Sequence, residues 1–247
     1  GQGNTWPGDS LAQMIEGARW RFGALRVNAA FTLANAGYDS DIYFGFGGNF
    51  VPDWTFSASV PVQVILPLSK KVVLDLSDTP QYLFYLDTQR ERAWNNTFRG
   101  QVHFALDRVY LQMGGGMADV RRRFSPEINL NFREKRDVLD GLALWQASKA
   151  TSIALSYERS QYDYGDAEYL GTSIAEMLNR NEDHVDMVTF FQPSLRTRFF
   201  FDGQFGQYAF TGGTSSIRNA RSYGIFGGVD FIPRAGEAEG RTGMGGG

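Results

Sequence analysis

The chain contains no cysteine and only two histidines among its 247 residues. Without cysteine it has no disulfide framework, no thiolate metal site and no cysteine nucleophile. Its 24 basic and 27 acidic side chains nearly cancel, which leaves a formal net charge of −3. Proteins that bind nucleic acids normally carry a strongly basic domain. We therefore expect no nucleic-acid partner, and the residue types present predict no cofactor.

Long hydrophobic runs are also missing. No stretch approaches about 18 consecutive apolar residues, so a membrane-spanning helix is excluded. The mean hydropathy of −0.31 is still compatible with membrane-spanning strands, whose alternating residues average out to polar. No basic and then apolar signal peptide stands at Gly1. We expect either a chain that starts after cleavage of such a peptide or one that was never exported.

A recurring alternation of apolar and polar residues is the strongest signal in the sequence. Every even residue from Trp54 to Leu66 is apolar, while Thr55, Ser57 and Gln63 lie between them. Because successive side chains of a strand point to opposite faces, this pattern predicts strands with one apolar and one polar face. The predicted strands cover residues 19–33, 40–47, 53–66, 71–89, 94–107, 108–122, 126–147, 150–163, 184–193, 195–210 and 221–233, with a weak remnant near 240–247.

Short and long connections alternate between these strands. The short ones fall at residues 68–70, 107–108, 148–149 and 193–194, and the long ones at 88–95, 121–126, 164–183 and 211–220. Outer-membrane barrels have this asymmetry, with short turns on the periplasmic rim and long loops outside. The alternation requires residues 126–147 to form one strand, which the even positions of Val138, Leu142 and Leu144 indicate. Residues 172–178 of the longest loop predict one or two helical turns.

These patterns predict an all-β fold, a transmembrane antiparallel up-and-down β-barrel of about 12 or more strands over residues 19–247. Its apolar face carries large aromatics such as Trp54, Phe104 and Phe201, and its polar face is rich in arginine, aspartate and glutamine. A secreted soluble barrel or sandwich, which packs mostly aliphatic side chains inward, is the alternative. The end of the chain lacks the terminal aromatic of completed outer-membrane barrels. We therefore expect a C-terminally incomplete barrel, whose strand count is a lower bound.

Residues 1–18 differ from the rest. Ser10 and Gln13 form a capping-box pattern, and Gly17 follows the apolar residues Leu11 and Met14. This predicts a short amphipathic N-terminal helix. It either plugs the barrel mouth or lies at the rim, or it is simply a docked tail.

Three segments resemble a known family. They are RTRFFFDGQFGQYAF (residues 196–210), RSYGIFGGVDFIPR (residues 221–234) and the stretch 69–100, which ends in YLFYLDTQRERAWNNTFRG. They look like bacterial outer-membrane β-barrel proteins of the porin-like family associated with exopolysaccharide export. The resemblance covers most of residues 19–234. It implies an outer-membrane location and a porin-like or export role, and it supplies no catalytic motif.

The polar phase places a group of arginines and one aspartate in the lumen. These candidate lumen-lining residues are Arg19, Arg21, Arg99, Arg108, Arg196, Arg198 and Asp202. Rings of arginine select anions in pores. Alternatively these arginines pair with carboxylates and simply fill the lumen; the candidate partners are Asp75, Asp87, Asp107, Asp202 and Asp230. The run at residues 121–123 lies at a predicted outer rim, where it either contacts anionic lipopolysaccharide or is a solvated strand end.

Catalytic and metal patterns are weak. His103 and His184 lie on other predicted strands than Ser152, Ser156 and Ser160, so the spacing does not assemble a serine–histidine pair. The carboxylates at residues 163–166 and 182–184 match no metal-binding spacing, and the glycines at 114–116 precede no helix. We therefore predict a protein that is not an enzyme.

Two functions follow from the sequence. The first is an outer-membrane porin-like channel or export port for polar or anionic solutes, polysaccharide among them. Its partners would be outer-membrane lipid and lipopolysaccharide. The alternative is a structural or adhesive envelope barrel with a plugged lumen and partner-binding loops.

Overall fold

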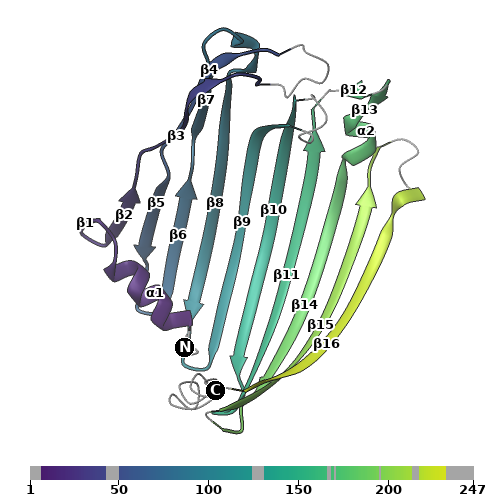
Figure 1. The fold of residues 1–247 in the computed structure, drawn as a ribbon. Helices are drawn as coiled ribbons and strands as arrows, with labels where there is room; N and C mark the ends of the chain where they lie inside the picture. The colour runs from purple at the N-terminus through teal and green to yellow at the C-terminus, as the bar shows by residue number, and fades with distance from the viewer. Residues whose placement is uncertain are drawn as a thin grey trace, which may run out of the picture.

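The computed structural model describes residues 7–42, 50–123, 131–165, 168–169, 171–194, 196–212 and 217–231. An antiparallel 14-stranded sheet forms nearly all of the fold, and a two-stranded hairpin stands apart from it. Figure 1 shows this sheet as one wide curved surface, with a short N-terminal helix against the lower ends of its first strands. The predicted all-β antiparallel class and the N-terminal helix are thereby confirmed.

Most strands of the large sheet pair with their neighbours along the chain. The strands are β1 (Trp20–Phe22), β2 (Leu25–Ala29), β3 (Thr32–Asp39), β4 (Asp53–Ser59), β5 (Val62–Pro67), β6 (Val72–Asp78), β7 (Gln81–Tyr85), β8 (Ala93–Ala105), β9 (Val109–Arg123), β10 (Asn131–Gln146), β11 (Thr151–Tyr164), β14 (Arg180–Phe191), β15 (Thr197–Phe210) and β16 (Ala220–Phe231). The separate hairpin is β12 (Glu168–Tyr169) and β13 (Thr172–Ser173), and the helices are α1 (Pro7–Glu16), the 3₁₀ turn η1 (Gln89–Glu91) and α2 (Ile174–Leu178).

Prolines divide two of the predicted strands. The predicted strand 53–66 is interrupted at Pro61, between β4 and β5, and the predicted strand 71–89 at Pro80, between β6 and β7. A proline has no N–H to donate to the ladder. The register nevertheless continues across the break, because Val60 N–H donates to the Pro80 carbonyl at 3.1 Å. The N-terminal prediction 19–33 is divided likewise, into β1, β2 and the start of β3.

Register sorts the side chains onto the two faces that the alternation predicts. Leu111 pairs with Phe104 and Ala143, and Leu155 pairs with Met187, on what we call the apolar face. The opposite, polar face carries Arg99, Gln101, Asp140, Glu158 and His184 among others. Phe200 lies on the polar face, opposite Phe190, as the one exception that the sequence pattern showed in its strand.

The prediction for residues 126–147 is half right. Residues 126–130 lie outside the described residues. From Asn131 to Gln146 β10 is a single strand, but its even residues lie on the polar face, where Leu142 pairs with Gln112 and Ser156. The odd residues Leu139 and Trp145 face the apolar side, where they are 59% and 51% exposed. The apolar run around these residues puts leucines on both faces, so its phase does not identify the outer one.

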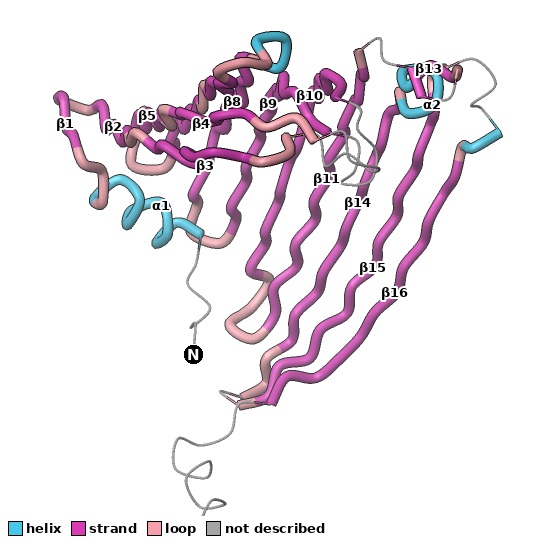
Figure 2. The backbone as a smooth tube through the Cα atoms, turned by 45° about the horizontal axis from the view of Figure 1, so that its top comes forward, coloured by secondary structure: helices cyan, strands magenta, loops and turns pink. Residues whose placement is uncertain are grey.

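The sheet is an open trough, as Figure 2 shows. Within the part of the chain that the structure describes, no pairing joins β16 to β1, β2 or β3. Closure of the predicted barrel is therefore not observed. The predicted strand 40–47 has only residues 40–42 described, and these follow the end of β3 without forming a strand; the predicted remnant 240–247 lies outside the described residues. β14 begins at Arg180, before the predicted start at 184.

The two α-helices, α1 and α2, lie against the polar face. In α1, Leu11 is buried and the Met14 sulfur lies 3.5 Å from Nε2 of Gln63, a polar-face residue of β5. The helix begins at Pro7, three residues before the predicted cap, since proline fits the first helical position. In α2, which confirms the predicted helical turn, Ile174 is fully buried beside Phe132 and Tyr164. No helix among the described residues has both the length and the apolar content to cross a membrane.

Candidate functional site: the polar face of the sheet

Ion pairs run across the polar face from strand to strand. The Arg99 Nη2 atom lies 2.8 Å from Oδ1 of Asp140, which joins β8 to β10. The Arg136 Nη2 atom on β10 lies 2.9 Å from Oε1 of Glu158 on β11. Each guanidinium thus has a carboxylate partner on a neighbouring or next-neighbouring strand. The face is rich in charge, and the charge of each of these two guanidinium groups is offset by a carboxylate.

A further arginine continues this network on β14. The Arg180 Nε atom lies 2.5 Å from Oε1 of Glu182, and its guanidinium stacks 4.3 Å from the centre of the Tyr162 ring. Stacking on an aromatic face and pairing with a carboxylate both use the planar guanidinium, which lysine does not offer. Arg180 therefore fixes the entry of β14 against β11.

Neutral polar groups fill the spaces between the ion pairs. Gln63 donates from Nε2 to both oxygens of Asp75, at 3.1 and 3.0 Å. Gln204 donates to Oδ2 of Asp202 at 2.9 Å, while Oδ1 of that carboxylate is buried and has no hydrogen-bond partner among the described residues. The polar face is therefore a connected hydrogen-bonding surface rather than a set of isolated charges.

The structure places the candidate lumen residues in three kinds of position. Arg99, Arg198 and Asp202 lie within strands on the polar face. Arg21 lies in β1 opposite Arg26, and Arg26 in turn pairs with Ile65 on that same face.

The other three candidates lie outside the strands. Arg19 precedes β1, with its guanidinium 5.7 Å from the Trp20 ring centre. Arg108 and Arg196 lie in exposed turns next to β9 and β15 rather than in the strands. The alternation of apolar and polar residues could not show this, because the pattern continues from each strand into the turn next to it.

The predicted arginine–aspartate pairing is found for one arginine of the group. Nε and Nη2 of Arg198 lie 3.0 and 2.6 Å from Oδ2 of Asp230, between β15 and β16. Arg99 pairs instead with Asp140, and Asp107 pairs with Lys71 at 3.2 Å. Sequence reasoning missed Asp140 because its strand was assigned the opposite phase.

The middle of the polar face holds a cavity of about 510 Å³ lined by Glu158, Asp140, His184, Ser156 and Asp186. Register brings Ser156 and His184 onto neighbouring strands, which the sequence analysis did not foresee because a long loop separates them. The Ser156 hydroxyl, however, donates to Oδ2 of Asp186 at 3.4 Å. His184 Nε2 lies 3.6 Å from Glu182. No hydrogen bond between Ser156 and His184 is found in these strands, so the arrangement lacks an assembled nucleophile and base.

The lower end of the polar face, near the short turns, is covered. Ile65, Val73, His103 and Tyr110 are all at most 5% exposed there. His103 Nδ1 and the Tyr110 hydroxyl lie 2.8 Å apart, and Figure 1 shows α1 crossing this region. Such burial on an otherwise polar, open face requires a covering element, and α1 is the described element that lies there.

The start of α1 also reaches toward the later strands. Pro7 lines a cavity of about 300 Å³ together with Leu144, Ser152, Phe190 and Arg198. The helix therefore spans from Gln63 of β5, near one edge of the trough, toward β10–β15. The helix is therefore docked across the lower end of the polar face.

At the upper end, a buried carboxylate fixes the connection after β7. Asp53, 1% exposed, accepts backbone N–H bonds from Leu86, Asp87 and Thr88 at 2.9, 3.0 and 2.7 Å. Burial alone raises the pKa of Asp53, but the hydrogen bonds from Asp87 and Thr88 outweigh it and hold the pKa below its usual value. Asp53 thus stays ionised and holds this rim of the trough in place.

Arg121, from the predicted rim cluster, is paired within the chain. Its Nη2 atom lies 2.8 Å from Oε2 of Glu91, and its Nη1 atom donates to the Arg90 carbonyl at 2.8 Å. Asn131 donates to the same Glu91 oxygen at 2.7 Å. Glu91 therefore holds the Arg121 guanidinium and the Asn131 amide together at this end of the sheet.

No group of three or more histidine, aspartate or glutamate side chains suited to a metal ion occurs in the described ranges. The chain matches no protein-family model, and a search of curated proteins also finds no match. The structure alone therefore defines the class: an all-β antiparallel sheet with a charged, hydrogen-bonded face and an exposed apolar face.

Proposed function

We propose that the chain forms a transmembrane β-barrel of the bacterial outer membrane that serves as a channel or export port for polar solutes. The observation that carries the proposal is the apolar face. Its large side chains are exposed, with Met113 at 66%, Phe201 at 48% and Ile225 at 75%. Soluble monomers rarely expose contiguous apolar patches beyond a few hundred Å². Hydrocarbon is the solvent that such a face fits.

The apolar face ends where a membrane boundary is expected. Across β11, β14, β15 and β16, one row of paired residues on this face is charged or polar: Arg159, Asp183, Gln207 and Arg221. Below this row the face is apolar, and on β16 it runs from Tyr223 to Phe231. That length is close to the about 9–11 residues that a tilted strand needs to cross a bilayer. Tyr157 and Tyr223 lie at the boundary, where aromatic girdles belong.

In lipid, the free edges of the trough must be paired. An unsatisfied backbone group costs several kcal/mol in hydrocarbon, so an open sheet edge is not tolerated there. In the proposed barrel, the outer edge of β16 pairs with the edge at β1–β3 or with a further strand. The polar face then encloses the lumen.

The ion pairs favour polar over strictly anionic solutes. A pore that selects anions needs arginine charge that carboxylates do not offset. Here Arg99, Arg136 and Arg198 each have a carboxylate within 2.9 Å. The proposed lumen therefore offers many hydrogen bonds and no excess of arginine charge, which suits neutral or weakly charged solutes, saccharides among them.

A structural envelope barrel with a plugged lumen is the second candidate, and α1 favours it. The helix covers the lower end of the polar face and buries Leu11 and Ala18. A fixed plug would block conduction, whereas a displaceable one would gate it.

Planar-bilayer conductance separates the two candidates. We expect the full chain to conduct weakly and a variant that lacks residues 1–18 to conduct more strongly, with little preference between chloride and potassium. No current from either protein, although both partition with outer-membrane fractions and need detergent, leaves the plugged structural barrel. A chain that stays monodisperse in buffer without detergent contradicts both.

A further inference from the structure

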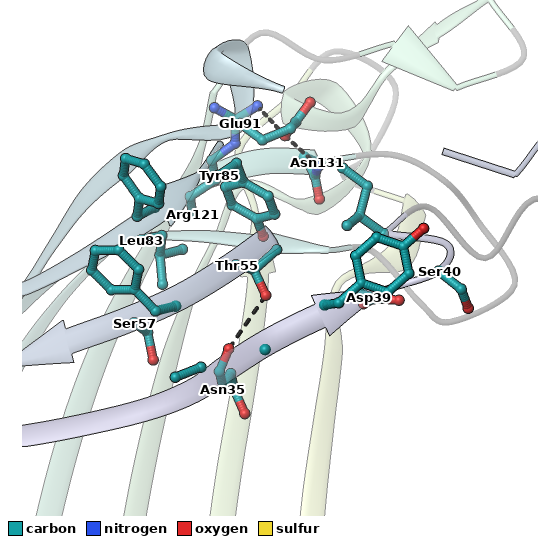
Figure 3. Close-up of a pocket in the computed structure, with 16 residues that line it drawn as sticks. Asn35, Asp39, Ser40, Thr55, Ser57, Leu83, Tyr85, Glu91, Arg121 and Asn131 are labelled. Carbon is teal, nitrogen blue, oxygen red and sulfur yellow. Dashed lines mark hydrogen bonds and ion pairs between the residues drawn. The ribbon is translucent and has the colours of Figure 1, made fainter. Parts of the chain in front are cut away.

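The upper end of the trough contains a third cavity, larger than the two described above, that the channel function does not require. It has a volume of about 670 Å³ and lies among β3, β4, β7 and the ends of β9 and β10. Figure 3 shows Tyr85 in its middle, with Glu91, Arg121 and Asn131 on one side and Thr55 and Asn35 on the other. This volume lies in the usual range of small-molecule sites, about 300–1,000 Å³.

The polar groups of this cavity are prearranged. Arg121 and Asn131 both contact Oε2 of Glu91, at 2.8 and 2.7 Å, so three planar groups are held together at one wall. On the opposite wall, the Thr55 hydroxyl donates to the Asn35 carbonyl at 3.3 Å. Groups whose orientation is already fixed bind a ligand with a smaller entropic cost.

Tyr85 lies between these walls with its hydroxyl uncommitted. Among the described residues this hydroxyl has no hydrogen-bond partner, although the side chain is half-buried. Burial, and then the charge of Glu91, raise the pKa of Tyr85, so the hydroxyl remains protonated at neutral pH. It is therefore available both to donate and to accept, and the ring beside it offers an apolar surface.

The backbone of β3 is distorted at this cavity. The register of β3 against β4 shifts between Ala34 and Gly37, which marks a β-bulge. Asn35 within the bulge has a φ of 50°, a left-handed conformation that is uncommon for residues other than glycine. Bulges occur next to binding sites, where they redirect side chains. Here the bulge brings Asn35 to the cavity wall.

The charge balance of the cavity identifies the ligand class. The Arg121 charge is offset by Glu91, and Asp39 adds a second carboxylate to the lining, so an anion gains little there. The described residues offer no cluster suited to a metal ion. Besides these charges the cavity offers aromatic rings, two amides and several hydroxyls. Sugar hydroxyls each donate and accept, and the C–H face of a sugar ring packs on an aromatic ring.

We propose that this cavity binds one or two units of an uncharged oligosaccharide, with Tyr85 packed against a sugar ring and with Asn35, Asn131 and the Arg121–Glu91 pair holding its hydroxyls. The inference rests on the proposed function, because it names the class of solute that the port recognises at its upper mouth.

The test compares two tyrosines of β7 that point to opposite faces. Tyr85 lines the cavity, whereas Tyr82 stacks on Trp94 of the apolar face, with ring centres 4.8 Å apart. Titration calorimetry of the detergent-solubilised full chain uses maltohexaose, cellohexaose and laminarihexaose as neutral probes and tri-galacturonic acid as the charged probe. We expect saturable binding of at least one neutral probe. Tyr85→Phe should weaken it about threefold to tenfold, the usual worth of one hydrogen bond, and Tyr82→Phe should leave it unchanged.

Three results overturn the inference: no neutral probe binds, the charged probe binds more tightly than every neutral one, or the two tyrosine variants behave alike. Asn35→Gly, which keeps the left-handed backbone and removes the amide, gives a second readout and should also weaken binding. Conductance distinguishes this failure from failure of the proposed function. A protein that conducts and binds no saccharide remains a port without this site, and one that binds without conducting keeps the site as a receptor in the envelope.

Discussion

The first and last strands of the sheet are built in opposite ways. From β2 to β7 the strands are short and are separated by breaks, and β3, β4 and β7 lie off the main path of the sheet. β8–β11 and β14–β16 each run without interruption, as in β10 (Asn131–Gln146). In the first region, Pro61 causes the break between β4 and β5, and Pro80 the break between β6 and β7. The first region, together with the ends of β9 and β10, carries the large upper cavity, and the second carries most of the apolar face. The interrupted strands thus form the upper cavity, whereas the uninterrupted strands form most of the apolar face.

We expect the largest effect on stability from a charged residue placed on the apolar face of the uninterrupted strands. Phe201→Arg on the apolar face of β15 should lower the free energy of unfolding by about 2–4 kcal/mol, if the residue faces the middle of a bilayer. Gln204→Arg on the polar face of the same strand should be mild, because Asp202 and Asp186 lie beside it. Urea titrations in lipid vesicles measure both. Equal losses would refute the assignment of the faces.

The next prediction concerns the close approach of β8 and β9 at Gly116. A Cβ added at Gly116 of β9 would lie 2.6 Å from the Phe98 carbonyl oxygen, a backbone atom that cannot move aside alone. Gly116→Ala should therefore cost about 1–3 kcal/mol, as overpacking usually does. Gly203→Ala in β15 is the matched control, since a Cβ there meets nothing within 4 Å. If both variants unfold at the same urea concentration, tight packing of β8 on β9 is not what requires glycine.

In the region of interrupted strands, the stability that Asp53 contributes should instead depend on pH. The pKa of Asp53 is lowered in the folded chain, so its contribution to stability is present above the unfolded value of about 3.9 and is lost as pH falls through the folded pKa. Asp53→Asn keeps the size but loses acceptors for backbone N–H groups, at a cost of about 1–3 kcal/mol at pH 7. The difference between wild type and variant should shrink below about pH 4. Proteolysis of the 86–88 segment as a function of pH measures it, and a constant difference would contradict the assignment.

The comparison also shows what the sequence could reveal. The period of two predicted the long strands well, because each of β8, β9, β11, β15 and β16 has one phase that is mostly apolar. It was wrong about the face of β10, where leucines occupy both phases, and it ran through Pro61 and Pro80 as if they were ordinary strand residues. It placed Arg99, Arg198 and Asp202 on the polar face.

The candidate sites were harder to predict than the strands. Sequence reasoning missed the partner of Arg99 and the neighbourhood of Ser156 and His184, since register across a long loop is not written in any single strand. The upper cavity was missed for a similar reason. Its walls come from strands far apart in the sequence, and only the folded sheet brings Asn35 and Arg121 to the same cavity.

We expect the smallest effect from an ion pair between the uninterrupted strands β15 and β16. Arg198 and Asp230 join the last two strands, and their side chains remain 36% and 46% exposed. Exposed pairs usually contribute about 0.2–1 kcal/mol, so a double-mutant cycle with Arg198→Ala and Asp230→Ala should give a coupling in that range. It should weaken at high salt, because solvent ions screen exposed charges. A coupling of several kcal/mol that is insensitive to salt would mean that these groups are shielded from water, and a sealed rather than water-filled lumen would follow.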